Sequence, residues 1–292
     1  MTGGVHCVSD GASALPVWGL RPFVSRYEGY RLSGFEPGSH VGMPSTDLTV
    51  VLPIGAPVTL SRTAMVDQSP GNFGPLASGL GVRPIVIEHD GEQEGIQISL
   101  TSSGCRALFG VPPEALRQYV VSLDDLMGVD VRRIMNAVCD LSTWSDRFEV
   151  LDRVLSARVT RNAHEDRHAR VDQRLLGAWG QLIGTESVTV AEVADNVGWS
   201  RRRLESRFAA EFAVTPRDAI RLGRFARSHA MLRRPVPPKL GEVAAASGYF
   251  DQAHMARDWR AFAGAAPSVW RANEVFAFVQ DEVGRAAAGS PS

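Results

Sequence analysis

The chain of 292 residues has three cysteines, a single lysine and no long hydrophobic run. Cys7, Cys105 and Cys139 show neither close pairing nor zinc-type spacing, which argues against a disulfide-stabilised secreted domain and against a zinc finger. Because no stretch of about 18 uncharged apolar residues occurs, a membrane span is not expected. The first ten residues also lack the basic-then-apolar layout of a secretory signal. We therefore expect a cytoplasmic protein with reduced thiols.

Signatures of catalysis are missing as well. The chain has no Gly-x-Ser-x-Gly nucleophile motif and no His-x-His pair of the kind that places two metal ligands on one strand. We therefore predict that the protein is not an enzyme, and that it has no catalytic residues, metal or cofactor. A metal site stays open as an alternative because potential ligands are present, namely His40, Glu88, His89, Asp90, Glu92 and Glu94.

The net charge of −1 hides an uneven distribution. Residues 1–170 carry 15 arginines against 19 acidic residues, whereas residues 171–273 carry 14 arginines and the one lysine against 10 acidic residues. The stretch 199–239 alone has 11 basic residues and three acidic ones. A basic stripe confined to one domain suits a polyanionic partner, although a solvated helical face has the same composition.

The N-terminal half has the pattern of a small β-domain. Short apolar runs broken by Gly and Pro extend from about residue 22 to 103, which predicts a small β-barrel or sandwich. Asp90-Gly91 separates the runs 84–88 and 95–100, and Asp-Gly predicts a hairpin between them. Six aromatic residues line a pocket or fill the core in this prediction: Trp18, Phe23, Tyr27, Tyr30, Phe35 and Phe73.

Helical periodicity begins near residue 112. Short helical pieces are predicted at 113–117 and 123–127, and amphipathic helices at 130–141 and 147–161, which pack on the barrel or pair between two copies. Almost all of 171–273 is predicted to be helical. The resulting division is a flexible N-terminus at 1–16, a β-rich sensor or dimerisation domain at 17–161, a linker at 162–170, a helical domain at 171–273, and a short helix with a disordered tail at 274–292.

An internal repeat is the strongest signal in the chain. Segment 190–199 matches segment 240–249 at an offset of 50 residues, and one inserted residue then moves the offset to 51. The matching pairs include Glu192 with Glu242, Gly198 with Gly248, Phe208 with Trp259, and Pro216 with Pro267. Such a repeat indicates one supersecondary unit used twice.

Each repeat has the pattern of a helix-turn-helix. In the first repeat, Thr189 and Glu192 form a capping box that opens a helix, Gly198 permits a sharp turn, and Ser200 caps a second helix. The corresponding turn and cap residues of the second repeat are Gly248 and Asp251. Between the repeats, Thr215-Pro216-Arg217-Asp218 predicts the start of a linker helix that runs to about Leu232.

In these residues the sequence resembles the AraC/XylS family of transcription regulators. The residues that carry the resemblance are Val243-Ala244, Gly248-Tyr249, Asp251-Gln252, His254-Met255, Arg257, Trp259, Ala266-Pro267 and Trp270-Arg271. The family usually has phenylalanine in place of Met255 and Trp259, and threonine or serine in place of Ala266, so that helix cap is weakened here. The resemblance covers about 171–273, and the front domain is more loosely similar to the cupin-like sensor modules of this family.

The resemblance implies that the second helix of each unit enters the major groove, with the two insertions about one helical turn, roughly 34 Å, apart. We expect Arg202 and Arg257 to read bases, followed by Gln252, and Ser200, Arg203 and Arg260 to meet phosphates. The full set of expected DNA-binding residues is Ser200, Arg201, Arg202, Arg203, Glu205, Ser206, Gln252, Ala253, Ala256, Arg257 and Arg260.

The sequence therefore predicts an α+β protein of two domains: a cupin-like β-barrel or sandwich with flanking helices, then an all-α domain of two helix-turn-helix units joined by a linker helix. The predicted function is a sequence-specific DNA-binding transcription regulator. Expected partners are double-stranded promoter DNA, RNA polymerase, a small-molecule effector and a second copy of the chain, and no membrane is involved. The resemblance favours activation through RNA polymerase, while repression by blocking a promoter is equally compatible with these residues. The alternatives are a cupin-type metalloprotein and a constitutive regulator whose N-terminal domain serves only for dimerisation.

Overall fold

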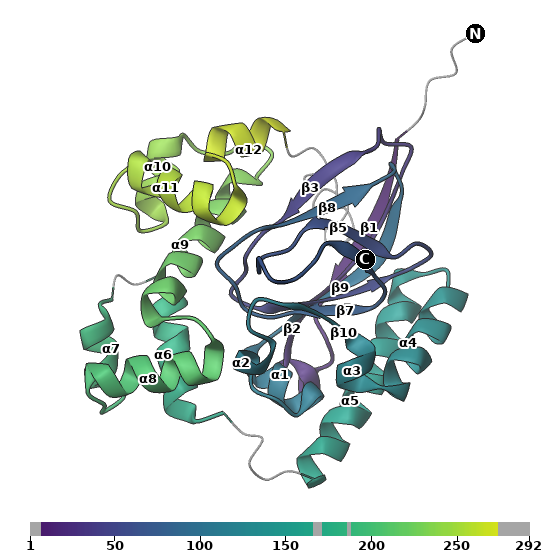
Figure 1. Ribbon diagram of the computed structural model, residues 1–292, viewed down its shortest axis with the longest axis horizontal. Coiled ribbons are helices and arrows are strands. Elements are labelled where there is room, and N and C mark those ends of the chain that lie inside the picture. Colours follow the sequence, from purple (N-terminus) through teal and green to yellow (C-terminus); the bar gives the residue numbers. More distant parts are fainter. Residues whose placement is uncertain (1–6, 166–170, 186–187, 274–292) are drawn as a thin grey trace, which may run out of the picture.

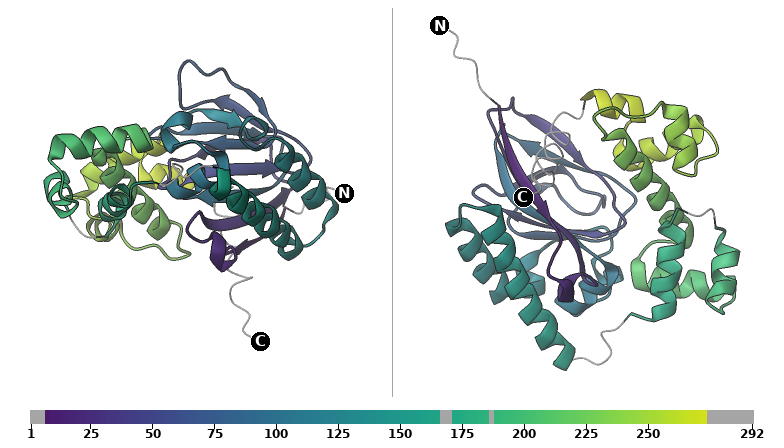
Figure 2. Two further views of the ribbon diagram at one scale, coloured as in Figure 1. Left: turned by 90° about the horizontal axis from the view of Figure 1, so that it is seen from below. Right: turned by 180° about the vertical axis from the view of Figure 1, so that it is seen from behind.

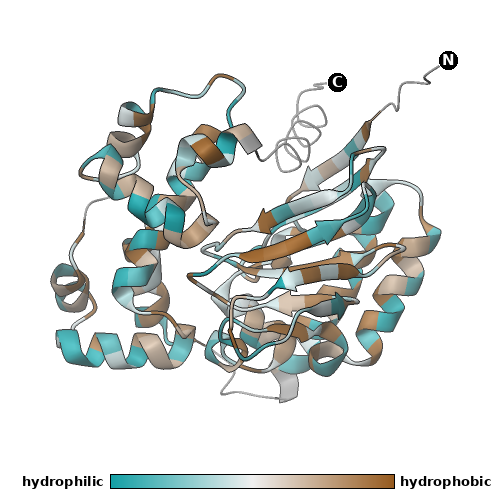
Figure 3. Cartoon of the chain, turned by 45° about the horizontal axis from the view of Figure 1, so that its top comes forward, coloured by the Kyte–Doolittle hydropathy of each residue, from teal (hydrophilic) through white to brown (hydrophobic). Residues whose placement is uncertain are grey.

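The computed structural model describes residues 7–165, 171–185 and 188–273, and it shows a β-rich domain beside a helical domain (Figure 1). This arrangement confirms the predicted α+β class with two domains. Hydrophobic residues concentrate in the strands and on the inward sides of the helices (Figure 3). None of the helices in the described ranges is long and apolar enough to span a bilayer.

Two antiparallel sheets form the N-terminal domain. The six-stranded sheet has the order β1 (Val8–Ala14), β2 (Val24–Ser33), β9 (Gln93–Leu100), β4 (Leu48–Pro53), β7 (Leu76–Ser78) and β10 (Val120–Ser122). The four-stranded sheet has the order β3 (Gly38–Gly42), β8 (Ile85–His89), β5 (Val58–Arg62) and β6 (Gly71–Phe73).

The six-stranded sheet packs against other elements on both of its faces. Along β9, Ile96, Ile98 and Leu100 are fully buried on one face because side chains alternate along a strand. Tyr27 lies on this face and stacks on Phe148 of a covering helix, with ring centroids 5.6 Å apart. The opposite face meets the second sheet through an apolar cluster that draws on both sheets, with Leu60, Leu76 and Val120 at its centre.

Helices cover the outer face of the six-stranded sheet (Figure 2). They are the 3-10 helix η1 (Trp18–Leu20), α1 (Ser102–Phe109), α2 (Pro113–Leu116), α3 (Leu123–Met127), α4 (Val129–Asp140) and α5 (Trp144–Glu165). Four of the five α-helices coincide with predicted helical pieces to within a few residues, and α1 was not predicted. Thr101 caps α1 by accepting from the backbone of Gly104, which extends the chain directly from strand β9 into helix.

The prediction of a flexible N-terminus over residues 1–16 is wrong for residues 8–14. Strand β1 pairs with β2 from Val8 opposite Ser33 to Ala14 opposite Tyr27. The Trp144 indole of α5 also donates to the Asp10 carboxylate at 3.0 Å. Backbone pairing and this tertiary bond hold a segment whose Gly/Ser-rich composition suggested a loose end.

The predicted hairpin around Asp90-Gly91 is also wrong. Strand β8 pairs with β3 and β5, whereas β9 pairs with β2 and β4, so the two runs belong to different sheets. Gly91 has a φ of 101°, and a Cβ there would lie 2.0 Å from the carbonyl oxygen of Phe35. The glycine thus permits a corner between sheets and a close approach to the β2–β3 connection.

The predicted linker starts too early, because residues 162–165 belong to α5. Residues 166–170 and the predicted last helix and tail at 274–292 lie outside the described residues.

Seven helices form the C-terminal domain in the described part of the chain. They are α6 (Gln173–Ile183), α7 (Val190–Asn196), α8 (Arg201–Phe212), α9 (Pro216–Leu232), α10 (Leu240–Ala246), α11 (Gln252–Ala263) and α12 (Pro267–Asn273). Thr215 caps α9 through the backbone of Asp218, and Pro216 stands at its first turn, as predicted. Both helical units touch the β-domain: the first shares its core cluster, and Met43 and Val82 pack against the core of the second.

Candidate nucleic-acid interface

The first helix-turn-helix unit consists of α7 and α8. Thr189 and Glu192 form the predicted capping box at the start of α7. Gly198 takes a φ of 70°, which glycine adopts without strain, and turns the chain between the helices. The Ser200 side chain then accepts from the backbone of Arg203 and opens α8. Every local prediction for this unit is confirmed.

The second unit, α10 and α11, repeats the backbone hydrogen bonds of the first unit's turn. The Trp199 amide donates to the Ala194 carbonyl at 2.9 Å, and the Tyr249 amide donates to the Ala244 carbonyl at the same distance. Gly248 has a φ of 83° and occupies the turn. The corresponding cap of α11 is Asp251, which accepts from the backbone of His254. The sequence repeat thus corresponds to two turns with the same backbone hydrogen bond and a glycine at the same place.

Aromatic side chains pack the core of each helix-turn-helix unit. In the first, Trp179 lies over Phe208 and Phe212, with centroid distances of 5.5 Å and 4.7 Å. In the second, Trp259 packs against Phe225 at 4.9 Å, and its indole donates to the Ser228 hydroxyl at 2.9 Å. Trp259 stands where the family usually has phenylalanine. Its indole makes a buried hydrogen bond to the hydroxyl of Ser228 in α9, which phenylalanine could not make.

One arginine of the linker helix fixes the spacing between the units. The Arg227 guanidinium donates to the carbonyls of Ile183 and Gly184 at 2.7 Å and 2.6 Å, and to that of Ser247 at 3.1 Å. It thereby joins the end of α6 to the end of α10. Burial, together with nearby Arg224, lowers the pKa of Arg227.

Two arginines of the basic stripe are therefore structural. Besides Arg227, Arg221 donates to Asp258 at 2.9 Å and to Asp218 at 3.2 Å. Charge counting included both in the basic stripe and left open whether its residues meet a polyanion or solvent; these two instead bind groups within the helical domain.

The predicted DNA-binding residues lie at or near the surface of α8 and α11. Nine are exposed, and Glu205 and Ala256 are half-buried; the exposed ones are Ser200, Arg201, Arg202, Arg203, Ser206, Gln252, Ala253, Arg257 and Arg260. Arg201 pairs with Glu205 at 3.0 Å, and the Arg203 guanidinium lies 5.2 Å from the centre of the Trp199 ring. Arg202, Arg257 and Arg260 form no ion pair with residues in the described ranges.

The C-terminal ends of both second helices point toward the β-domain. Glu211 near the end of α8 binds Arg106 of α1, and Nη2 of Arg62 lies 4.0 Å from where a Cβ on Gly264, the C-cap of α11, would stand. The N-terminal ends are left uncovered: that of α8 carries the exposed Arg201, Arg202 and Arg203, whereas that of α11 carries the exposed Gln252 and Ala253, with Arg257 one turn further along. Recognition helices contact base edges through their N-terminal residues, so the uncovered ends are the appropriate ones.

Sequence reasoning missed two exposed residues on this surface. Arg207 is exposed on α8, and Phe250 is exposed in the turn of the second unit. Helical spacing from Arg203 gives Arg207 as a neighbour on the same face, so the signal for it was present. Phe250 is the residue inserted where the offset changes from 50 to 51.

The β-domain brings together one pair of potential metal ligands. His40 of β3 and His89 of β8 lie with ring centroids 5.8 Å apart, and burial together with His89 lowers the pKa of His40 to about 4. The carboxylate of Glu94 instead binds Arg31 and Arg147. Within the described residues, no group of three or more His, Cys, Asp or Glu is placed to hold a metal ion.

The six aromatic residues proposed for a pocket do not gather at one place. Trp18 is 81% exposed, whereas Tyr27 is fully buried against α5 and its hydroxyl donates to Asp152 at 3.0 Å. Tyr30 falls on the opposite face of β2 from Tyr27, the face toward the second sheet, and burial raises its pKa to about 12. Phe73 joins the apolar cluster between the sheets.

Comparison with known proteins agrees with this geometry. A family model described as a helix-turn-helix domain matches residues 193–273. The C-terminal domain is an AraC-type helix-turn-helix domain. This AraC-type domain marks the chain as a DNA-binding protein of transcription regulation, and it confirms the resemblance read from the sequence.

The whole chain also resembles solved structures of ToxT from Vibrio cholerae. One ToxT structure is 11% identical, with 91% of this chain and 96% of that chain covered and a TM-score of 0.51, and another, refined at 1.65 Å, has 11% identity, coverage of 91% and 97%, and a TM-score of 0.52. A ToxT structure with bound unsaturated fatty acid is 9% identical, with coverage of 91% and 94% and a TM-score of 0.51. At this identity the likeness shows a shared fold. No curated protein matches the chain.

Proposed function

We propose that the chain is a sequence-specific transcription regulator that inserts α8 and α11 into successive segments of the major groove of its operator. The observation that carries the proposal is the repeated helix-turn-helix geometry, in which α8 exposes arginines in its first turn and α11 exposes Gln252 in its first turn and Arg257 one turn further along. Arg202 and Arg257 are the proposed base readers, because a free guanidinium binds guanine bidentately, with Gln252 next. Ser200, Arg203 and Arg260 are proposed to position the duplex through phosphates.

We further propose that the β-domain controls this activity by binding a small molecule. ToxT structures contain an unsaturated fatty acid in one case and (E)-4-(8-methylnaphthalen-1-yl)but-3-enoic acid in another. In this chain apolar side chains lie between the two sheets, including Phe73 and Ile87 of the four-stranded sheet, and Tyr30 lies on the facing side of the six-stranded sheet. Homodimerisation and contact with RNA polymerase belong to the same proposal.

The test is selection of bound fragments from sheared genomic DNA by the purified full chain at about physiological salt. An enriched motif with two half-elements about one helical turn, roughly 34 Å, apart is expected. Binding to that motif should fall steeply with salt because arginines neutralise phosphates. Absence of binding even at low salt would overturn the proposal and leave the repeat as a helical scaffold.

A further inference from the structure

Phe250 stands out on the surface of the second unit. Its side chain is 93% exposed, whereas the preceding Tyr249 is 4% exposed and packed in the core. In the first unit Trp199 is followed directly by the helix cap Ser200. In the second unit Phe250 is inserted between the corresponding tyrosine and the cap Asp251. The second turn therefore presents an aromatic side chain for which the first turn has no counterpart.

The backbone on both sides of Phe250 is fixed. The Tyr249 amide donates to the Ala244 carbonyl at 2.9 Å, and the Asp251 carboxylate accepts from the His254 amide at 2.6 Å. Both caps are extended, and they differ mainly in φ, which is −153° at Asp251 and −66° at Ser200. The extra residue thus goes with a changed φ at the cap, and its side chain is exposed at the start of α11.

The surroundings of this ring belong to the proposed reading surface. Gln252 and Ala253 are exposed in the first turn of α11, and Arg257 is exposed one turn further along the helix. A phenyl ring gains nothing from a phosphate, because its face is electron-rich. Among the groups that base edges present in the major groove, the 5-methyl of thymine is the apolar one, and phenylalanine is among the side chains that contact it.

We propose that Phe250 packs against the 5-methyl group of a thymine in the half-element read by α11. This inference rests on the proposed function and adds a specificity-determining residue to it. It also distinguishes the two halves of the operator: the second half-element contains a required thymine, and the first unit imposes no equivalent requirement through its turn.

The experiment measures affinity of the full chain for the selected operator by fluorescence anisotropy, replacing each thymine of the second half-element singly by deoxyuridine, which removes only the methyl group. At one position we expect wild-type affinity to fall about fourfold, the effect of one lost buried methyl group. Phe250→Ala should lose at least as much on the unmodified operator and show no further loss at that position. Phe250→Leu should retain most of the affinity and the sensitivity to the methyl group.

The control is Val66→Ala, which removes an equally exposed apolar side chain, 93% exposed, from the β-domain and should bind as wild type. The inference is overturned if Phe250→Ala weakens binding while wild type ignores every methyl group, since the ring then contacts the sugar-phosphate backbone. It is also overturned if Phe250→Ala binds as wild type, since the ring then serves another partner. Both results leave the proposed function intact; failure of wild type to select any motif overturns both.

Discussion

The guanidinium of Arg106 in α1 and the carboxylate of Glu211 in α8 form two parallel hydrogen bonds, 2.7 Å and 2.6 Å long, between the β-domain and the first helix-turn-helix unit. The side chain of Glu211 is 8% exposed and that of Arg106 is 21% exposed. The pair therefore holds a helix proposed to enter DNA against the proposed sensor domain.

This geometry predicts an asymmetry between the two single variants. Arg106→Ala leaves a buried carboxylate without its counter-charge, and it should lower the free energy of unfolding by about 3 kcal/mol. Glu211→Ala should cost less, because the more exposed arginine can turn toward water. The measurement is urea denaturation of both variants and of the double variant, with an expected coupling of about 1–3 kcal/mol. Equal costs for the two single variants, with no coupling, would show that the contact is incidental.

Arg257→Ala tests the proposed base contact. The variant should lose about 1–3 kcal/mol of binding free energy at the selected operator and relax the preference at one base pair. Competition binding against operators mutated at each position measures both effects. Arg234→Ala is the control, because it removes the same charge from an exposed position beyond the end of α9. Uniform weakening by Arg257→Ala on all sequences would reduce the side chain to a phosphate contact.

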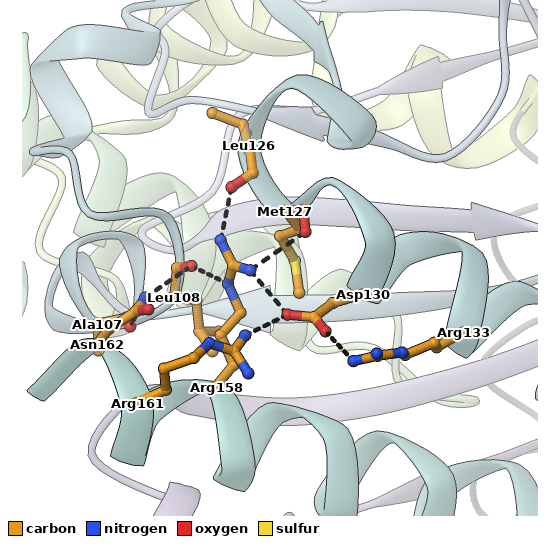
Figure 4. A network of polar contacts seen from close by, with 9 residues as sticks. All are labelled: Ala107, Leu108, Leu126, Met127, Asp130, Arg133, Arg158, Arg161 and Asn162. Carbon is orange, nitrogen blue, oxygen red and sulfur yellow. Dashed lines mark hydrogen bonds and ion pairs between the residues drawn. The ribbon is translucent and has the colours of Figure 1, made fainter. Parts of the chain in front are cut away.

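Asp130 anchors a network in which three arginines have unequal roles (Figure 4). Arg158, 13% exposed, binds Asp130 and also donates to the carbonyls of Leu108, Leu126 and Met127, so it caps α1 and α3 from α5. Arg133, 69% exposed, reaches Asp130 only at 3.3 Å from within α4. The hydrogen bonds from Arg158 and Arg161 lower the pKa of Asp130 even though burial acts to raise it.

Arg158→Ala should therefore lower the free energy of unfolding by about 3 kcal/mol, because it removes the most buried of the three arginines paired with Asp130 and also removes the donor to three helix-end carbonyls. Arg133→Ala should cost less than about 0.5 kcal/mol, as for exposed ion pairs in general. Thermal and urea unfolding of the two variants, which remove the same charge next to the same carboxylate, measure the difference. Similar costs would argue that Asp130 is accessible to water in solution.

The features that were predicted correctly from the sequence are those that depend on a few neighbouring residues. The caps at Thr189, Ser200, Thr215 and Asp251 are correct because a cap depends on a few adjacent residues and one turn of helix. The two-fold use of a helix-turn-helix was visible for the same reason, since each unit carries its own signals. Most of the predicted DNA-binding residues are exposed because the apolar spacing of α8 and α11 fixes which face is buried.

Long-range pairing was not predictable in the same way. The Asp90-Gly91 signal correctly marks a change of direction, but the partners of β8 lie 43 to 51 positions upstream in β3 and 24 to 29 positions upstream in β5, and no short-range signal specifies them. Arg227 joins α6 to α10 across separations of 44 and 20 residues, and Arg106 meets Glu211 across 105. Composition shows that these residues are charged, while only the folded chain shows which charges are already paired.

His229 predicts how the second unit responds to acid. Its ring lies in α9, stacked on Phe225 with centroids 6.0 Å apart and 4.9 Å from the ring of Trp270. Its buried Nε2 makes no hydrogen bond with the described residues. Burial, with a contribution from Arg233, lowers the pKa of His229 to about 3. The folded domain therefore holds a neutral imidazole.

In the unfolded chain His229 is protonated below about pH 6.5, whereas in the folded chain it stays neutral down to about pH 3. The free energy of unfolding should therefore decrease as the pH falls from 6.5 to 3, by up to about 1.4 kcal/mol per pH unit. Above pH 6.5 this residue should not change the pH dependence of stability.

Hydrogen exchange of peptides from α9 and α11 between pH 7 and 4.5, corrected for intrinsic rates, measures the opening free energy of the domain. His229→Phe should flatten the pH dependence, since phenylalanine keeps the aromatic packing and cannot be protonated. The matched control is His254→Gln, which removes a half-buried histidine from the surface of α11 instead. An unchanged slope in His229→Phe would mean that the acid sensitivity of this domain arises from its carboxylates, whose ion pairs break at lower pH.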